Sequence, residues 1–183
     1  SFDNIKYHGR NGESYRDMKD HTQVEDVVCS VSDMTEPNIK PQESGNRFDC
    51  TWAKVSDGET EFAFTAVDKP FELGVKPYTD TALLSMKHRC DEVRTGTYVT
   101  ISAFQMGIGT GSCGPATLEQ YCYPVDGEYE LKFMISLYQK RNGTDVRLVA
   151  YVDDLAAYTS VSFTLTINGV ESKELVCTTA YAG

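Results

Sequence analysis

Turn-forming residues interrupt this chain at intervals of about ten residues, a spacing at which short strands alternate with turns. Glycine, proline and Asn-Gly or Asp-Gly pairs supply the turns, for example at Asn11-Gly12, Asp57-Gly58, Asn142-Gly143 and Asn168-Gly169. Such pairs provide the positive φ angles that a two-residue turn between antiparallel strands requires. The spacing therefore predicts an all-β fold built from short antiparallel strands.

The segments between the turns carry a strand pattern. Residues 61–67 and 98–104 alternate between two faces with a period of two and are rich in β-branched and aromatic residues, which predicts a strand in each. Apolar residues also occupy every second position of residues 161–167, and a return strand to Val176 follows Asn168-Gly169. This last pattern predicts a C-terminal β-hairpin extension.

A similar pattern surrounds Asn142-Gly143. The alternating residues 129–137 precede this pair and residues 146–152 follow it. They form either a second hairpin or the end of one domain and the start of another. Because the polar stretch around the pair is the best boundary candidate, we expect one domain over residues 1–139. Residues 140–183 are then additional strands that weakly resemble the start of an appended module.

Only one segment has the spacing of a helix. Asp80 is expected to cap it, and residues 81–88 place Ala82, Leu83 and Met86 on one side. A helix of this length has about two turns, so the chain remains predominantly β.

The charge balance excludes two classes of partner. The chain has 17 Lys and Arg residues against 27 Asp and Glu residues, a formal net charge of -10 at pH 7. Nucleic acids and anionic membranes bind surfaces with an excess of basic residues. The sequence also lacks an apolar run long enough to span a bilayer. We therefore expect no nucleic acid and no membrane as partner, whereas neutral ligands stay open.

The six cysteines predict free thiols rather than a metal site. No Cys-x-x-Cys pair and no histidine at ligand spacing accompanies them; they are Cys29, Cys50, Cys90, Cys113, Cys122 and Cys177. The chain thus offers no zinc motif. Most of the thiols are expected to be reduced, because 183 residues can bury a core without disulfides. An exported protein could still pair them.

The beginning of the sequence indicates that a longer protein precedes it. Residues 1–7 open directly in a strand pattern, without an initiating methionine. They also lack the charged start and apolar run of a secretory signal. The sequence therefore does not choose between a cytoplasmic and a secreted protein.

Three blocks of residues carry a resemblance to a known family. The first block is the sequence YHGRNGESYRD at residues 7–17. The second is Asp33-Met34 followed by PQESGNRFD at residues 41–49. The third is strongest and runs through Pro77-Tyr78-Thr79, Lys87-His88, QMGIGTGSCGP at residues 105–115, and Tyr121.

In this order, the blocks resemble the last domain of the glycoside hydrolase family 2 β-galactosidases, the lactose-splitting enzymes of many bacteria. The resemblance covers about residues 1–139. It departs from the family pattern in the first block, where the usual Gly-Pro pair is altered and Met18 replaces a basic residue. It implies an antiparallel β-supersandwich of the galactose mutarotase-like type, present here in partial form as its second part.

The resemblance also implies a sugar-site loop. In the family, the loop that corresponds to residues 107–115 reaches the mouth of a neighbouring (β/α) barrel and lines the sugar site. The expected substrate-binding residues are therefore Gly111, Ser112, Cys113 and Gly114. Many relatives carry at the Cys113 position a tryptophan that stacks on the sugar, and a cysteine contact would be weaker. Alternatively, the glycines only form a tight turn and Cys113 is a buried apolar residue.

The chemistry requires groups that this chain does not display. Retaining glycoside hydrolysis uses two carboxyl groups about 5 Å apart, one as nucleophile and one as acid/base. The resemblance implies that both belong to the barrel, as do the Mg and Na ions that parent enzymes commonly use. We therefore expect no catalytic residue, no metal ligand and no cofactor here, and no activity of the chain alone. The implied partners are a galactoside and the catalytic barrel of the same parent enzyme.

Other candidate residues have structural explanations. The block from Glu43 to Arg47 is either a ligand site or a buried arginine–carboxylate pair that locks a turn, and we favour the pair. The three histidines, His8, His21 and His88, are scattered and are expected to make local hydrogen bonds. Trp52 is expected in the core or on a sheet face.

Two further functions stay open. A freestanding carbohydrate-binding β module suits the acidic, tyrosine-rich sheet pattern. A structural interaction domain, including a homo-oligomer, suits a partial sandwich with exposed sheet edges and apolar faces.

Overall fold

The computed structural model describes residues 1–107, 114, 116–141 and 144–152, and the short strands 160–163, 166–167, 170–171 and 175–178. Strands dominate this part of the chain, and every strand pair is antiparallel. The prediction of an all-β antiparallel fold is confirmed. The finer assignment to a galactose mutarotase-like supersandwich stays a prediction.

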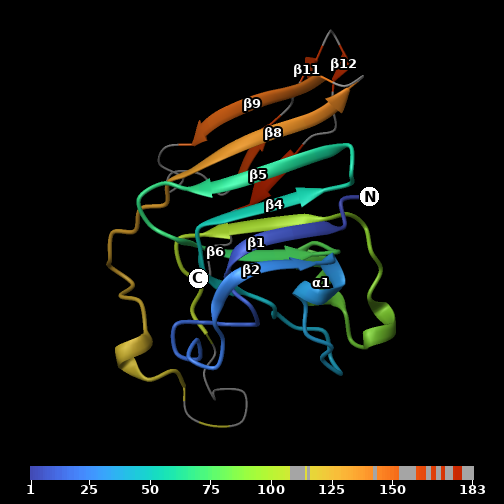
Figure 1. Ribbon diagram of the computed structural model, residues 1–183. Helices are drawn as coiled ribbons and strands as arrows, with labels where there is room; N and C mark the ends of the chain where they lie inside the picture. The colour runs from blue at the N-terminus through green and yellow to red at the C-terminus, as the bar shows by residue number, and fades with distance from the viewer. Residues whose placement is uncertain are drawn as a thin grey trace.

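The larger sheet contains six strands in the order β2-β1-β4-β5-β8-β9 (Figure 1). Their bounds are β1 Asn4–Arg10, β2 Val24–Cys29, β4 Trp52–Ser56, β5 Thr60–Ala66, β8 Phe133–Arg141 and β9 Thr144–Val152. Strand β5 confirms the strand predicted over residues 61–67. It pairs with β4 across Asp57-Gly58, where Gly58 has a φ of +95°.

The smaller sheet contains three strands in the order β3-β6-β7. Their bounds are β3 Arg47–Cys50, β6 Phe71–Lys76 and β7 Tyr98–Ser102, so β7 confirms the strand predicted over residues 98–104. Alternate residues of β6 point to opposite faces. Phe71, Leu73 and Val75 belong to the apolar core, which places Glu72, Gly74 and Lys76 on the other face.

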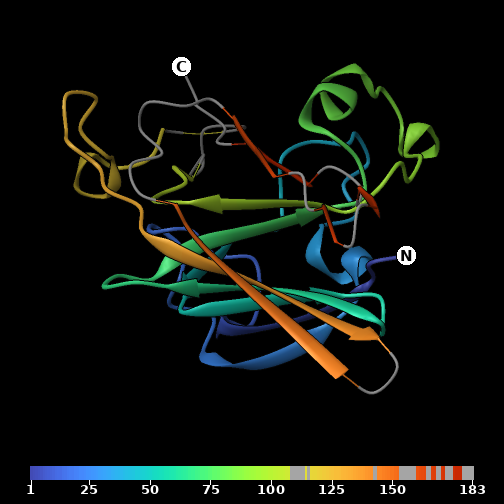
Figure 2. The same ribbon diagram turned by 90° about the horizontal axis from the view of Figure 1, so that it is seen from above.

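The core lies between the two sheets. Figure 2 shows β6 and β7 in one layer and β1, β2, β4 and β5 in the other. Both layers contribute the largest fully buried side chains, including Ile5, Tyr7, Phe64, Phe71 and Leu73. The 3₁₀ helix η1, Val31–Met34, adds Val31 and Met34 to the same cluster. Because each such side chain contributes about 1.5–3 kcal/mol on burial, this cluster is the main source of stability.

The helix α1 spans Asp80–Ser85, so its predicted position was nearly right and both its predicted ends were wrong. Its N-cap is Thr79, whose hydroxyl accepts the N–H of Ala82 at 3.1 Å. Asp80 does not cap, because its carboxylate is paired with Lys76 at 2.6 Å. The backbone becomes extended directly after Ser85. In the described part of the chain, no helix is both long and apolar enough to cross a membrane.

The short helical turns η2, Arg89–Asp91, and η3, Glu119–Tyr121, lie in the long connections on either side of β7. Strand pairing confirms the predicted C-terminal hairpin, and of the two alternatives for residues 129–152 it supports the hairpin. β8 pairs with β9 up to Arg141 opposite Thr144. In the C-terminal segment, β10 Ser160–Phe163 pairs with β13 Leu175–Thr178, and β11 Thr166–Ile167 pairs with β12 Val170–Glu171.

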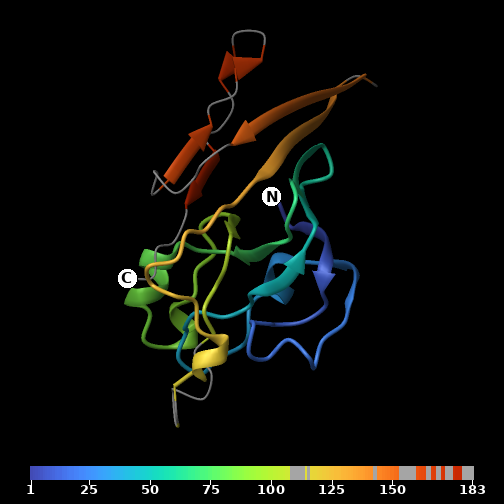
Figure 3. The ribbon, with the colours of Figure 1, turned by 90° about the vertical axis from the view of Figure 1, so that its left-hand side faces the viewer.

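The turn pairs Asn142-Gly143 and Asn168-Gly169 themselves lie outside the described residues. The strands that flank the second pair, β11 and β12, project beyond the two sheets (Figures 1 and 3). Strand β8 continues past residue 139, and β9 extends the same sheet. The division into a domain of residues 1–139 and further strands over 140–183 stays a prediction.

Candidate functional site

The glycine-rich segment follows β7 and starts at Gly107. Of the four residues expected to bind substrate, Gly114 lies at an exposed bend, whereas Gly111, Ser112 and Cys113 lie outside the described residues. The structure thus describes the base of this segment. The hydroxyl of Thr117 closes the base by donating to the carbonyl of Gly107 at 2.7 Å.

Gly107 packs directly against the first sequence block. A Cβ atom at this position would fall 2.5 Å from Oδ1 of Asp17 and 3.0 Å from Cβ of Tyr15. A side chain at position 107 therefore has no room unless its neighbours move. Tyr15 is buried, and burial, followed by the nearby Glu13 carboxylate, raises the pKa of its hydroxyl. The first block thus forms the surface on which the glycine-rich segment begins.

Hydrogen bonds join the first block to the second. The backbone N–H of Ser14 donates to the carbonyl of Asn46 at 2.8 Å, and the Asn46 amide returns a bond to the Ser14 carbonyl at 2.8 Å. The Ser14 hydroxyl accepts the N–H of Phe48 at 3.0 Å. Glu13 accepts the N–H of Gly45 at 2.9 Å. Because Ser14 and Asn46 are buried, water does not compete for their bonds.

Parts of all three blocks therefore meet in one place. We call residues 13–17, 45–48, 72 and 105–107 the polar junction. It lies at the end of β7 and supports the glycine-rich segment.

Arg47 is buried in this junction, 4% exposed, but it does not form the carboxylate pair that the sequence predicted. Its Nε donates to the hydroxyl of Tyr7 at 3.0 Å, Nη1 to the carbonyl of Gly45 at 2.9 Å, and Nη2 to the carbonyl of Asp33 at 3.0 Å. Among the described residues, no carboxylate pairs with it. The predicted carboxylate partner of Arg47 was wrong because carbonyl and hydroxyl oxygens accept the hydrogen bonds of its guanidinium group.

Glu72 is a buried carboxyl of the junction that no sequence pattern singled out. It is only 3% exposed. Oε2 accepts the amide N–H of Asn46 at 2.5 Å, whereas Oε1 has no hydrogen-bond partner in the described part of the chain. Burial raises the pKa of Glu72 to about 7, although the Asn46 bond acts in the opposite direction. This carboxyl therefore changes its charge near neutral pH.

Lys76 is the second charged residue on this face of β6. Its side chain is 7% exposed and bridges Glu43 at 2.5 Å and Asp80 at 2.6 Å. Beside it lies a cavity of about 30 Å³ lined by Glu43, Asn46, Gly74, Lys76, Asp80, Thr100, Ser102 and Gln105. Pockets for small molecules usually measure about 300–1,000 Å³, so this cavity suits water rather than a sugar.

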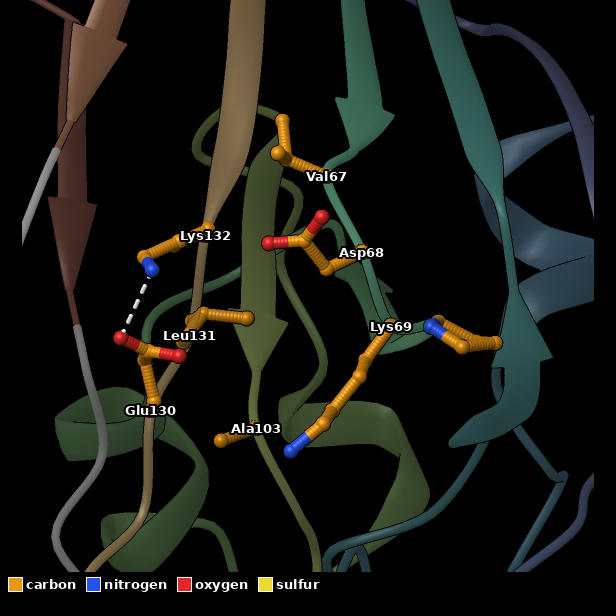
Figure 4. Close-up of a pocket in the computed structure, with 8 residues that line it drawn as sticks. Val67, Asp68, Lys69, Ala103, Glu130, Leu131 and Lys132 are labelled. Carbon is orange, nitrogen blue, oxygen red and sulfur yellow. Dashed lines mark ion pairs between the residues drawn. The ribbon is translucent and has the colours of Figure 1, made fainter.

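A second hollow lies between residues 67–70 and 130–132, beside Ala103 (Figure 4). Asp68, Lys69, Glu130 and Lys132 surround it, and Glu130 is paired with Lys132 at 2.8 Å. Its volume is about 60 Å³, again far below that of a ligand pocket. Neither hollow is large enough for a hexose without a further wall.

The remaining candidate residues have structural contacts. His8 lies 2.7 Å from Asp26 and stacks near Trp52, at 6.5 Å between ring centroids. His88 begins the helix η2, and its N–H donates to Asp91 at 2.9 Å. Both contacts agree with the expected local role of the histidines.

Cysteines in the described part of the chain carry free thiols. Four cysteines there, Cys29, Cys50, Cys90 and Cys122, are free, as predicted. Burial raises the pKa of Cys50 in particular, so this thiol is unreactive. No group of three or more His, Cys, Asp or Glu residues in the same part is placed to hold a metal ion.

The burial of Glu72 and Lys76 could not be predicted from the sequence, for a physical reason. Both lie in the alternating segment of β6, where charged residues normally mark the solvent-facing side of a strand. The polar junction and α1 cover that side instead. Nothing in the local sequence distinguishes a covered charged face from an open one.

Comparison with known proteins places the polar junction inside a matched region. Residues 1–135 match the family described as the β-galactosidase small chain. The chain is similar to β-galactosidases of Staphylococcus xylosus (31% identity over 139 residues), Streptococcus thermophilus (29% over 138) and Kluyveromyces lactis (30% over 129). These matches cover 73%, 73% and 66% of this chain but only 14%, 14% and 12% of the relatives. The chain therefore spans a small part of each relative's length.

Proposed function

The chain belongs to the family of β-galactosidase small chains, as its three sequence blocks predicted, and from that premise we propose that it is a noncatalytic part of a β-galactosidase. In this proposal, the glycine-rich segment forms one wall of a galactoside site. Another part of the same enzyme, a catalytic barrel, supplies the reacting groups. The reaction is the hydrolysis of terminal β-galactosides such as lactose.

The observation that carries this proposal is the arrangement around Gly107. Blocks that are far apart in the sequence meet at the polar junction, and hydrogen bonds of Glu13, Ser14 and Asn46 hold them together. A purely structural turn would not need a support assembled from three segments. A loop that must present its tip to a ligand does, because binding groups are effective only when their supports are rigid.

The carboxylates near the junction support a noncatalytic role. Glu13 accepts a backbone N–H, and Glu43 and Asp80 both pair with Lys76. Asp49 is paired with Arg10 at 2.9 Å. Glu72 is too deeply buried to touch a substrate. Since retaining hydrolysis needs two accessible carboxyl groups about 5 Å apart, we assign the nucleophile and the acid/base to the barrel.

The expected sugar contacts belong to the same proposal. Gly111, Ser112, Cys113 and Gly114 contribute backbone groups and a small side chain at the tip of the segment. A cysteine offers no aromatic face to a pyranose ring, so the contact at Cys113 is weaker than that of a tryptophan. Metal ions that the whole enzyme uses are held by the barrel.

Complementation tests the proposal. The chain is produced together with a β-galactosidase from which the corresponding C-terminal segment has been removed, and hydrolysis of a chromogenic β-galactoside is measured. Co-purification of the two polypeptides establishes that they fold and associate. We expect hydrolysis by the mixture and none by the chain alone. An associated complex without hydrolysis contradicts the proposal.

A second candidate function, a freestanding carbohydrate-binding module, rests on the outer face of the larger sheet. Trp52 is half-buried there and lies beside His8, and Lys54 on the same face is paired with Glu61 at 3.0 Å. An aromatic ring flanked by polar groups is a surface to which sugars bind. Saturable binding of galactose or lactose to the chain alone, abolished by Trp52→Ala, would favour this function over the first.

A role in subunit contacts is favoured by the edge strand β2. Val24 and Val28 are 45% and 73% exposed on this strand, and an open edge with apolar residues invites pairing with another chain. Sedimentation of the chain as a monomer at all concentrations would exclude it as the site of a homo-oligomer.

A further inference from the structure

Glu72 lies opposite the last residue of β7. In the register of the two strands it pairs with Ser102, so its carboxyl lies beside the chain as this leaves the sheet for the glycine-rich segment. The backbone N–H of Gln105 and the hydroxyl of Tyr123 both approach the carboxyl closely enough to change its pKa. Neither completes a hydrogen bond to Oε1, which has no partner in the described part of the chain.

The other carboxylate oxygen of Glu72, Oε2, is held in place by a hydrogen bond. Asn46 donates one amide hydrogen to Oε2 at 2.5 Å and another to the carbonyl of Ser14 at 2.8 Å. Because Ser14 also holds Phe48, the position of Oε2 is set by both the first and the second sequence block. Of the two carboxylate oxygens of Glu72, only Oε1 remains to interact with the third block.

The residue before Gln105 is anchored as well. The ring of Phe104 lies 4.4 Å from the centroid of Tyr123 and 4.4 Å from that of Tyr129. The guanidinium of Arg16 lies over the Tyr123 ring at 5.0 Å. The chain is thus held immediately before Gln105 and again at Gly107, which leaves the Gln105 N–H as the group whose position Oε1 can select.

We propose that Glu72 is a positioning residue for the glycine-rich segment: when its carboxyl is ionised, Oε1 closes the hydrogen bond with the backbone N–H of Gln105 that is open in this structure, and thereby sets the course of the chain into Gly107. The proposal rests on the function proposed above, because the segment is the part assigned to the galactoside. Glu72 acts through Gln105 and does not touch the substrate. An unpartnered buried carboxylate oxygen is costly, which gives this bond its driving force.

The strength of the bond depends on the charge of the carboxyl. A carboxylate accepts a hydrogen bond about twice as strongly as a neutral group, so the segment is best positioned when Glu72 is ionised. Among the described residues, the titratable groups that interact with Glu72 are Asp49 on β3, Tyr15 of the first block, Cys50 and Tyr123. Of the cations, Arg16 acts on Tyr123, and Lys76 lies on the same face of β6. Among the titratable groups, Asp49 opposes ionisation of Glu72.

Nuclear magnetic resonance of the full chain tests the geometry. The side-chain carboxyl carbon of Glu72 and the amide signals of Gln105 and Gly107 are followed from pH 5 to pH 9. We expect both amides to shift with the midpoint of Glu72. Glu72→Gln abolishes the shift, whereas Glu59→Gln, a change at an exposed position, leaves it intact. If the Gln105 amide of the unmodified chain does not follow Glu72, the proposal is wrong whether or not the variants fold.

Kinetics of the complemented enzyme test the consequence. The KM of the Glu72→Gln enzyme is divided by that of the unmodified enzyme at each pH. We expect a ratio near 1 at pH 6 that rises at least threefold by pH 8, with kcat little changed, and a ratio of 1 throughout for Glu59→Gln. A ratio that is equally high at every pH indicates a merely structural role and overturns the proposal. If the amides of Gln105 and Gly107 titrate with Glu72 but the associated complex does not hydrolyse β-galactosides, the proposed β-galactosidase function is wrong and the positioning role of Glu72 stands.

Discussion

Nε of Arg47 donates to the hydroxyl of Tyr7 at 3.0 Å. Arg47 belongs to β3 of the smaller sheet and Tyr7 to β1 of the larger one, so this bond ties the two layers together. Tyr7 is 1% exposed and Arg47 is 4% exposed. A charged donor that is buried this completely needs its acceptors, because unpaired it costs more than the bond itself provides.

Tyr7→Phe removes one of these acceptors and leaves the ring in place. We expect the free energy of unfolding in urea to fall by about 1–3 kcal/mol, the cost of an unsatisfied buried donor. Tyr98→Phe is the matched control, because the one hydrogen bond of its hydroxyl to a described residue is an exposed contact with Thr95, and it changes stability by less than about 0.5 kcal/mol. Equal effects of the two changes would contradict the assigned role of Tyr7.

Gly45→Ala tests the support of the polar junction. Gly45 has a φ of +82°, and a Cβ atom there would lie only 1.7 Å from the carbonyl oxygen of Met34. Strain of the backbone and the clash together are expected to cost more than about 3 kcal/mol.

The control for that change is Gly58→Ala in the β4–β5 turn. Gly58 also has a positive φ, +95°, but nothing lies within 4 Å of a Cβ atom there. The substitution therefore costs only the strain of a non-glycine residue at positive φ, about 1–2 kcal/mol. Denaturation in urea separates the two, and a Gly45→Ala variant no less stable than Gly58→Ala would show that the contact with Met34 is not tight.

Glu72→Gln changes stability in a pH-dependent direction. The pKa of Glu72 rises from 4.5 to about 7 on folding, so the folded state holds this proton more tightly than the unfolded state. The free energy of unfolding therefore falls as the pH rises from about 4.5 to about 7, by roughly 3 kcal/mol from this group. Glutamine has no proton to lose.

The Glu72→Gln chain is accordingly expected to match the unmodified chain at pH 5 and to be more stable above pH 7, by up to roughly 3 kcal/mol. Urea denaturation at pH 5 and pH 8 measures both values. If Glu72→Gln lowers the free energy of unfolding by the same amount at pH 5 and pH 8, then ionisation of Glu72 does not destabilise the folded state. The same carboxylate that weakens the fold positions the glycine-rich segment, a combination found at functional sites.

Cys113→Trp tests the sugar contact. In the proposed site, an aromatic ring at this position would pack on a pyranose face, and we take the about 0.5–1.5 kcal/mol of an aromatic pair as the scale of that contact. We expect the KM of the complemented enzyme for a β-galactoside to fall by roughly threefold to tenfold. Cys90→Trp, at an exposed position of η2, leaves KM unchanged. If Cys113→Trp and Cys90→Trp change KM equally, Cys113 does not belong to the sugar site.

The sequence predicts most of the fold because strand signals are local. Turn pairs such as Asp57-Gly58 and alternation in residues 61–67 depend only on neighbouring residues, and both were right. The cap of α1 was wrong by one residue. By residue type Asp80 is a better cap than Thr79, but its carboxylate is paired with Lys76, and the Thr79 hydroxyl caps the helix instead.

The polar junction is less predictable because its partners are distant. The second block identified Arg47 by resemblance, but two of its three acceptors, Tyr7 and Asp33, lie 40 and 14 residues away in the sequence, and no local pattern indicates them. Glu72 looks like any charged residue of an alternating strand. Its burial follows from the way three segments close over one face of β6.

In the proposed function, the glycine-rich segment lines a galactoside site only when the catalytic barrel of the same enzyme completes it. Alkylation of Cys113, followed at peptide level by mass spectrometry with a nonhydrolysable β-thiogalactoside present or absent, tests this most directly, with Cys90 as internal reference. The thiogalactoside should slow alkylation of Cys113 in the complemented enzyme and have no effect on the isolated chain. Equal protection in the isolated chain, or none in the active complex, would contradict the claim.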